Sequence, residues 1–143
     1  MLLKVWVKVF RLLVNELMLQ KKKVLLIDTK RNQMIHIDHN ARLIKPGMSF
    51  KEFTEKSWKL PEEYYGNRYP CMVHGIGLCD EWPLIKYPTD RGQREGNFEK
   101  NMTITVETYI GKVGGKEGIK LEQQYLVGEN NLELMSHHPL EHL

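Results

Sequence analysis

Two runs of alternating apolar and polar residues flank a glycine pair, and they constrain the fold more than any other feature. The runs read NMTITVETYIG and GIKLEQQYLV and lie symmetrically about Gly114-Gly115. Alternation with period two predicts strands, and the glycine pair predicts an antiparallel hairpin over residues 102–127. The symmetric register places Glu107 opposite Glu122 on the more polar face.

Opposed carboxylates repel each other unless a positive charge lies between them. Their Cβ atoms are expected about 5 Å apart, which is close enough for strong repulsion. A divalent metal ion is one candidate for the missing charge. The alternative is a solvated sheet face on which the glutamates pair with Lys112, Lys116 or Lys120. The hairpin pattern taken alone favours this second interpretation.

Length and composition indicate one domain of ordinary size. The chain has 143 residues, of which 41% are hydrophobic, and a net charge of +3. The basic residues are spread out, so nucleic acid is not an expected partner. The spacing of Cys71 and Cys79 fits neither a zinc knuckle nor a CxxC redox pair, which indicates a reducing, cytoplasmic setting.

The first twenty residues resemble a membrane anchor but are interrupted by charge. Lys4, Lys8 and Arg11 recur at helical spacing and give an amphipathic helix with a basic stripe. No apolar stretch is long enough to span a bilayer, and no cleavage site follows. We therefore expect no membrane partner, and interfacial binding stays open as an alternative.

The middle of the chain contains two expected helices. Residues 32–45 carry apolar side chains at helical spacing and are stopped by Pro46-Gly47. Ser49 and Glu52 form a capping box that begins the next helix, which Leu60-Pro61 ends.

Strands and loops are expected on either side of these helices. The segment 24–28, VLLID, predicts a short buried strand, and residues 68–78 predict another. Glycines at 75 and 77 indicate a bulge or the close approach of a ligand. The polar stretch 81–100, which contains two prolines, predicts a long and functional loop.

Several side chains are candidates for chemistry, each with a plainer alternative. His74 offers a nitrogen donor to an oxygen-rich metal site, or is a satisfied core residue. Asp80 and Glu81 offer an acid or a base, or form a solvated turn. Tyr69 offers a substrate contact, or packs on the sheet. The remaining candidates, expected to face solvent or belong to a loose terminus, are His36, His39, His137, His138 and His142.

Three motifs, HGIGLCDEWP, NMTITVETY and GIKLEQQYLV, agree in type, order and spacing with a known family. Over roughly residues 33–138 the chain resembles the C-terminal half of the pita-bread metalloenzymes, which include methionine aminopeptidase, aminopeptidase P, prolidase and creatinase. The resemblance implies an α+β fold, a curved antiparallel sheet backed by helices. It also implies metal ligands at His74, Glu107 and Glu122, and a pair of divalent ions such as Mn, Fe, Co or Zn.

The chain departs from that pattern in two places. The family uses two further aspartate ligands, and Asp28 and Asp38 do not fit them because Asp38 falls within a predicted helix. The peptidases also carry a histidine where this chain has Cys79-Asp80-Glu81. That version, with a tyrosine five residues before the metal histidine, is similar to the branch that cleaves dimethylsulfoniopropionate. The similarity implies that Asp80 is the base and Tyr69 its catalytic partner.

These observations lead to three functional hypotheses. The first is a metal-dependent hydrolase resembling Xaa-Pro aminopeptidases and dipeptidases, in a truncated copy, acting on a small molecule or short peptide and forming a homodimer. The second is a dimethylsulfoniopropionate lyase, and the third is a non-catalytic remnant without the aspartates. The expected organisation is an atypical segment 1–31, the half-domain 32–138 and a tail 139–143.

Overall fold

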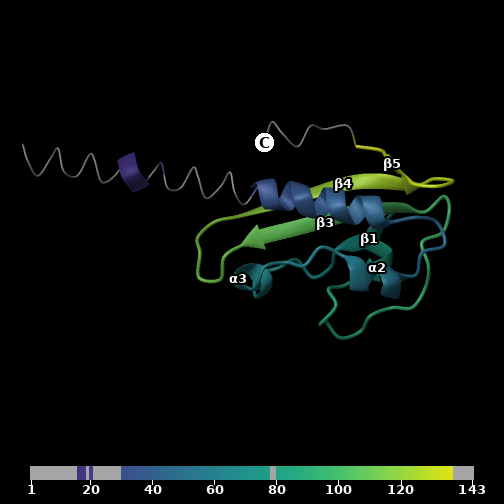
Figure 1. The fold of residues 1–143 in the computed structure, drawn as a ribbon, viewed down its shortest axis with the longest axis horizontal. Coiled ribbons are helices and arrows are strands. Elements are labelled where there is room, and N and C mark those ends of the chain that lie inside the picture. The colour runs from purple at the N-terminus through teal and green to yellow at the C-terminus, as the bar shows by residue number, and fades with distance from the viewer. Residues whose placement is uncertain (1–15, 19, 21–29, 78–79, 137–143) are drawn as a thin grey trace, which may run out of the picture.

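The computed structural model describes residues 16–18, 20, 30–77 and 80–136, with only the backbone at positions 80 and 81. Residues 16–18 and 20 are helical, and further helices span residues 30–43, Phe50–Lys56 (α2) and Glu62–Tyr65 (α3). Its strands are Val73–Ile76 (β1), Asp80–Ile85 (β2), Thr103–Gly111 (β3), Gly118–Val127 (β4) and Leu132–Leu134 (β5). They form one antiparallel sheet in the order β2-β1-β3-β4-β5 (Figure 1).

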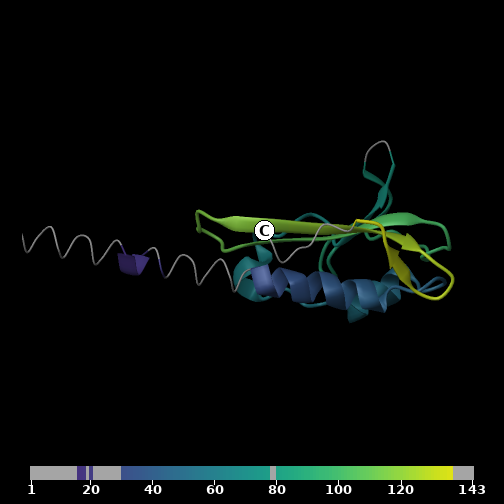
Figure 2. The same ribbon diagram turned by 90° about the horizontal axis from the view of Figure 1, so that it is seen from above.

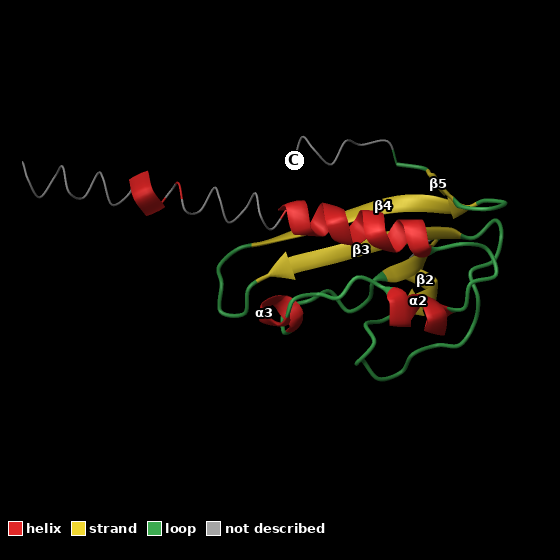
Figure 3. Ribbon diagram, in the orientation of Figure 1, coloured by secondary structure: helices red, strands yellow, loops and turns green. Residues whose placement is uncertain are grey.

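The long hairpin β3–β4 lies in the middle of this sheet and has the expected register. Glu107 is paired with Glu122, Thr105 with Gln124, and Tyr109 with Lys120. Figure 3 shows these two strands as the longest arrows of the sheet. The prediction of the hairpin and of its register is therefore confirmed.

The helix 30–43, α2 and α3 lie on one side of the sheet, as the view from above shows (Figure 2). Ile37 of the helix over residues 30–43 and Ile44, directly after its end, are each 1% exposed and pack in the core. These are positions that the helical spacing predicted. The α+β architecture, an antiparallel sheet backed by helices, is thereby confirmed.

An aromatic cluster packs α2 against the segment that leads into β3. Phe98 packs edge-on against Phe50 and Phe53, with ring centroids 5.1 and 5.6 Å apart. At its start, Ser49 Oγ accepts a hydrogen bond from the Glu52 amide at 3.1 Å. This is the expected half of the capping box. The reciprocal half is absent, because the Glu52 carboxylate pairs with Lys56 at 2.7 Å.

The structure corrects the expected loop over residues 81–100. Residues 80–85 form β2, which pairs with β1, and only the remainder is loop apart from one bridge between Ser49 and Asn97. Pro83 favoured a loop in the prediction, since proline has no N–H to donate to a hydrogen bond of a sheet. However, β2 is the outermost strand on its side, where a missing N–H costs little. The strand predicted over 68–78 is shorter than expected, and α2 ends at Lys56 rather than at Leu60.

Most of the first thirty residues lie outside the described part of the chain, including the expected strand at 24–28. Residues 30 and 31 belong to the helix that continues to residue 43. Within the described ranges, no helix combines the length and apolar character that crossing a membrane requires.

Candidate metal centre

Strand pairing brings the three predicted ligands to one face of the sheet. His74 of β1 lies opposite Thr105 of β3, and Glu107 follows two positions later on the same face. Glu122 of β4 lies opposite Glu107 and therefore shares that face. The next residue of β3, Thr108, points the other way and contacts His36 of the helix 30–43. The predicted ligands thus face away from the helices.

His74 and Glu107 are in direct contact. The Nε2 atom of His74 lies 3.4 Å from Oε1 of Glu107, whose side chain is 0% exposed. On the other side of the ring, Nδ1 donates a hydrogen bond to the Gly75 carbonyl at 2.8 Å. Since a carbonyl only accepts, Nδ1 carries a proton, and Nε2 is turned to the carboxylate. Metal-binding histidines commonly have this arrangement.

The glycine-rich strand contributes the bulge that its sequence indicated. The register of β1 against β2 shifts between His74 and Gly75, so that Gly75 faces Glu81 after His74 has faced Leu84. A bulge of this kind re-aims side chains next to it. The backbone carbonyl that anchors His74 Nδ1 belongs to the same glycine.

A thiol that the sequence did not indicate as a candidate also contacts Glu107. Cys71 is buried, forms no disulfide, and donates a hydrogen bond from Sγ to Glu107 Oε1 at 3.1 Å. Its position three residues before His74 gave no periodic signal, because residues three apart in an extended segment point to opposite faces. The contact exists because Cys71 precedes β1 and is not constrained by its alternation.

Lys120 supplies the positive charge between the two glutamates. Its Nζ lies 2.9 Å from Glu107 Oε2 and 3.0 Å from Glu122 Oε2. Burial would lower the pKa of this ammonium, but the two carboxylates outweigh it and raise the pKa above its ordinary value. Of the lysines that the hairpin pattern offered as partners, Lys120 pairs with both glutamates, and Lys112 pairs with Glu63 instead.

Of the two predicted catalytic residues, the structure describes the side chain of Tyr69 but only the backbone of Asp80. The ring of Tyr69 lies against the Lys120 ammonium, with Nζ 4.1 Å from the ring centroid. Tyr69 therefore belongs to the same cluster as the predicted ligands. Asp80 begins β2, and its backbone is opposite Ile76 of β1. Its side chain lies outside the described part of the structure.

The donors fit a divalent ion in part. Two ligands of one metal ion, each about 2.1 Å from it, lie a little over 3 Å apart, which His74 Nε2 and Glu107 Oε1 satisfy. An imidazole with a carboxylate suits Mn, Fe, Co or Zn. Among the described side chains, however, no group of three or more histidine, cysteine, aspartate or glutamate residues is arranged to hold an ion. Glu122 is engaged with Lys120 instead of meeting the other two.

Among the described histidines, His36 lies on the opposite side of the sheet from the predicted ligands. His36, expected to face solvent, is 0% exposed, and its ring stacks on Trp58 with centroids 5.1 Å apart. Burial, helped by nearby His39, lowers the pKa of His36 to about 4. That expectation was wrong because the buried side of the helix also includes polar residues, Gln33 and Asn40 among them. The histidines at 137, 138 and 142 lie outside the described residues.

Asp38, which the sequence did not favour as a ligand, is paired elsewhere. It lies on the exposed side of the helix 30–43 and pairs with Arg42 at 2.8 Å. Asp28 lies outside the described residues.

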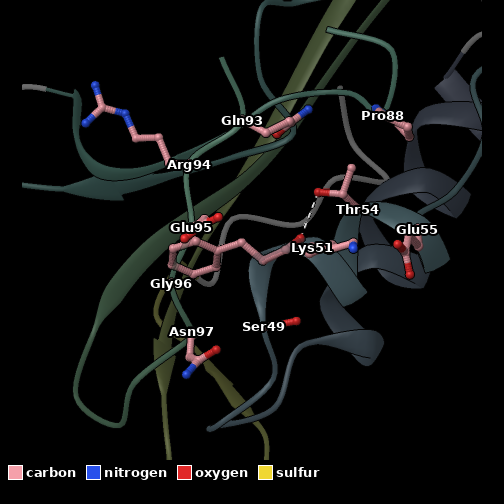
Figure 4. Close-up of a pocket in the computed structure, with 11 residues that line it drawn as sticks. Ser49, Lys51, Thr54, Glu55, Pro88, Gln93, Arg94, Glu95, Gly96 and Asn97 are labelled. Carbon is pink, nitrogen blue, oxygen red and sulfur yellow. Dashed lines mark hydrogen bonds between the residues drawn. The ribbon is translucent and has the colours of Figure 1, made fainter. Parts of the chain in front are cut away.

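A separate pocket opens between α2 and the segment that follows Pro88. It has a volume of about 550 Å³, and Figure 4 shows that its walls come from Lys51, Thr54 and Glu55 of α2 and from residues 93–97. Thr54 donates its hydroxyl to the Phe50 carbonyl at 2.8 Å, and Arg94 extends away from the pocket. None of the predicted ligands lines it, so this pocket is distinct from the metal-site face.

Comparison with known proteins places the chain in a family. The profile of metallopeptidase family M24 matches residues 34–129. The chain is 40% identical over 108 residues to the dimethylsulfoniopropionate lyase DddP of Roseovarius nubinhibens, and 35% identical over 124 residues to that of Roseobacter denitrificans. These alignments cover 74% and 85% of this chain but only 24% and 28% of the two lyases.

The fold is also similar to that of solved structures. The X-Pro aminopeptidase of Thermotoga maritima superimposes with a TM-score of 0.62 and 23% identity, over 80% of this chain and 32% of that one. The likeness extends the pita-bread resemblance from motifs to the arrangement of sheet and helices. The chain spans about a quarter of the length of the lyases that it matches. By the profile that covers most of its described domain, this chain belongs to metallopeptidase family M24.

Proposed function

We propose that this chain forms the metal-binding half of an active site of family M24, with His74, Glu107 and Glu122 as ligands of a divalent transition-metal ion. The observation that carries the proposal is the contact of His74 Nε2 with the fully buried Glu107 carboxylate. The Nδ1 hydrogen bond to Gly75 supports it, because that bond turns the other nitrogen toward the site. The donors suffice for one ion, and a second would need carboxylates from elsewhere.

A divalent ion bound there would act as a Lewis acid on an oxygen atom of the substrate. The chain's own residues define where a substrate reaches it. Tyr69 offers a ring and a hydroxyl at the side of the cluster, next to Lys120. Asp80 follows β1 at the start of β2, two strands from Glu107. We assign Asp80 the role of base and Tyr69 that of a substrate contact.

The reaction we favour is lyase chemistry on dimethylsulfoniopropionate. Both curated relatives are lyases of this compound. The segment Cys79-Asp80-Glu81 also stands where the peptidases carry a histidine. In such a reaction Asp80 takes a proton from the carbon next to the substrate carboxylate. The electron pair forms a carbon–carbon double bond, the carbon–sulfur bond breaks, and dimethyl sulfide and acrylate leave.

Hydrolysis of a peptide bond before or after proline is the second candidate. The superposition on an X-Pro aminopeptidase favours it, although at 23% identity that likeness concerns the fold alone. Both activities are proposed for an active site of which this chain provides one part, since it spans about a quarter of the lyases' length.

Metal titration by isothermal calorimetry tests the shared part of this proposal. The chain should bind Mn²⁺ or Zn²⁺ with micromolar or tighter affinity, and Glu107→Gln should abolish that binding. Glu62→Gln, which removes an exposed carboxylate from α3, is the matched control and should bind like the parent. Absence of binding in the folded parent would indicate a non-catalytic remnant.

Activity assays on the metal-loaded protein separate the two reactions. Release of dimethyl sulfide without hydrolysis of a proline dipeptide supports the lyase, and the reverse result supports the peptidase. Asp80→Asn should lower the lyase rate without weakening metal binding, because the metal ligands remain. If Asp80→Asn keeps the full rate, Asp80 is not the base.

A further inference from the structure

Lys120 occupies the place between Glu107 and Glu122 that a metal ion would need. Its ammonium is within 3.0 Å of a carboxylate oxygen on each side. The register of the hairpin enforces this position, because Lys120 precedes Glu122 by two residues and so shares its face. The strand pairing therefore places Lys120 on the face of the two glutamates, where its side chain can reach both.

Lys120 and its two carboxylate partners differ in how far they reach solvent. The Glu107 side chain is 0% exposed, that of Lys120 is 39% exposed, and that of Glu122 is 45% exposed. A carboxylate withdrawn from water requires a counter-charge. Glu107 thus needs a cation at all times, whereas the lysine can carry its ammonium into water on a flexible stem.

The charges indicate that a divalent ion would replace the Lys120 ammonium between the two glutamates. Two carboxylates with one ammonium leave one negative charge, while two carboxylates with a divalent ion are neutral. The ammonium and the ion cannot both approach Glu107 and Glu122 closely, because they repel each other across a few ångströms. The Tyr69 ring, whose centroid lies 4.1 Å from the Lys120 ammonium, is next to this position between the glutamates.

We propose that Lys120 is a tethered cation that holds Glu107 and Glu122 in the metal-free chain and must move into solvent when a metal ion binds. Lys120 then sets the metal affinity of the site, and its removal strengthens binding. This inference rests on the proposed metal site. It concerns the chain's own residue and predicts a measurable change in affinity that does not depend on catalysis.

The test compares Zn²⁺ and Mn²⁺ affinities of the whole chain and three variants by isothermal calorimetry. Lys120→Met should bind the ion about ten-fold or more tightly, the scale expected when a like charge a few ångströms away is removed. Lys120→Arg keeps the charge and should bind no more tightly than the parent. Lys112→Met makes the same change at a lysine paired with Glu63 on the surface, and should bind like the parent.

The outcomes separate this inference from the proposed function. Equal affinities for the parent and Lys120→Met overturn the role of Lys120 and leave the metal site intact. No binding by either folded protein overturns both. If Lys120→Met does not fold, the inference is tested on the parent by NMR. The ¹³Cε signal of Lys120 is assigned there by its absence from the spectrum of Lys120→Arg. That signal should shift on addition of Zn²⁺ as the ammonium leaves its carboxylates, and an unmoved signal in a zinc-bound chain overturns the inference.

Discussion

The Lys120 ammonium lies 2.9 Å from Glu107 in an ion pair of which only the lysine side reaches solvent. This asymmetry decides what each partner contributes to stability. Removal of Lys120 leaves the buried Glu107 carboxylate without a counter-charge. Removal of Glu122 breaks only a half-exposed ion pair, whose lysine can be solvated by water.

We predict that Lys120→Met lowers the free energy of unfolding of the metal-free chain by about 3 kcal/mol, the lower end for breaking a buried pair, since Lys120 is partly exposed. Glu122→Gln should cost less than about 1 kcal/mol. Urea unfolding in the presence of a chelator measures both. Equal costs for the two variants would show that Glu107 does not depend on Lys120.

His36 makes stability depend on pH. Its pKa in the folded chain is about 4, below the ordinary 6.5, because it is buried. Between these two values the unfolded chain binds a proton that the folded chain does not, so stability falls as pH falls through this window. The loss contributed by His36 is about 3 kcal/mol by pH 4.

The variant His36→Gln isolates this effect, since it keeps a polar side chain that can reach Thr108 but does not titrate. The free energy of unfolding of the parent, measured between pH 7 and 4, should fall more steeply than that of the variant. His39→Gln removes an exposed histidine bonded to the Lys56 carbonyl and should change the pH curve much less, because burial and not His39 is the main cause of the lowered His36 pKa. Parallel pH curves for parent and His36→Gln would refute the assignment.

Tyr109 packs over the glycine at the start of β4. A Cβ at Gly118 would collide with the Tyr109 hydroxyl, so Gly118→Ala should cost about 1–3 kcal/mol by overpacking. In a Tyr109→Ala background the same change should cost much less, and a double-mutant cycle measures the coupling. Additive costs would indicate that the penalty has another origin.

A second glycine of the hairpin separates overpacking from backbone strain. Gly114 has a φ of +75° and no atom within 4 Å of a built Cβ. Gly114→Ala should therefore cost about 1 kcal/mol through its left-handed conformation, and Tyr109→Ala should not change that cost. Thermal unfolding of the single and double variants provides the comparison.

The N-terminal cap of α2 gives a further stability prediction. Ser49 Oγ accepts the Glu52 amide, and Ser49→Ala should lower the free energy of unfolding by about 1 kcal/mol. Glu52→Gln should change stability by less than half of that, because the Glu52 carboxylate makes an exposed pair with Lys56 and not a capping bond. Urea unfolding that ranks Glu52→Gln above Ser49→Ala would contradict the cap geometry.

The sequence predicts well whatever depends on local periodicity. The register that pairs Glu107 with Glu122 follows from strict alternation about two glycines, and it needed no knowledge of the rest of the chain. The motif resemblance supplied His74 and the fold. Spacing could not show that β2 lies at the edge of the sheet, where Pro83 is tolerated.

What the sequence could not predict depends on contacts between distant segments. His36 lies on the buried side only because Trp58 and Thr108 enclose its ring. Cys71 meets Glu107 from outside the regular strand. Lys120 was one of three lysines available to the glutamates, and only the folded hairpin shows that it reaches both.

A crystal structure of the chain grown with Zn²⁺ would show whether His74 and Glu107 hold a metal ion, because anomalous scattering locates the ion itself. We expect an anomalous peak within about 2.3 Å of both His74 Nε2 and Glu107, with the Lys120 ammonium turned away from them. A zinc ion bound only elsewhere, or a Glu107 carboxylate still paired with Lys120 at saturating zinc, would contradict it.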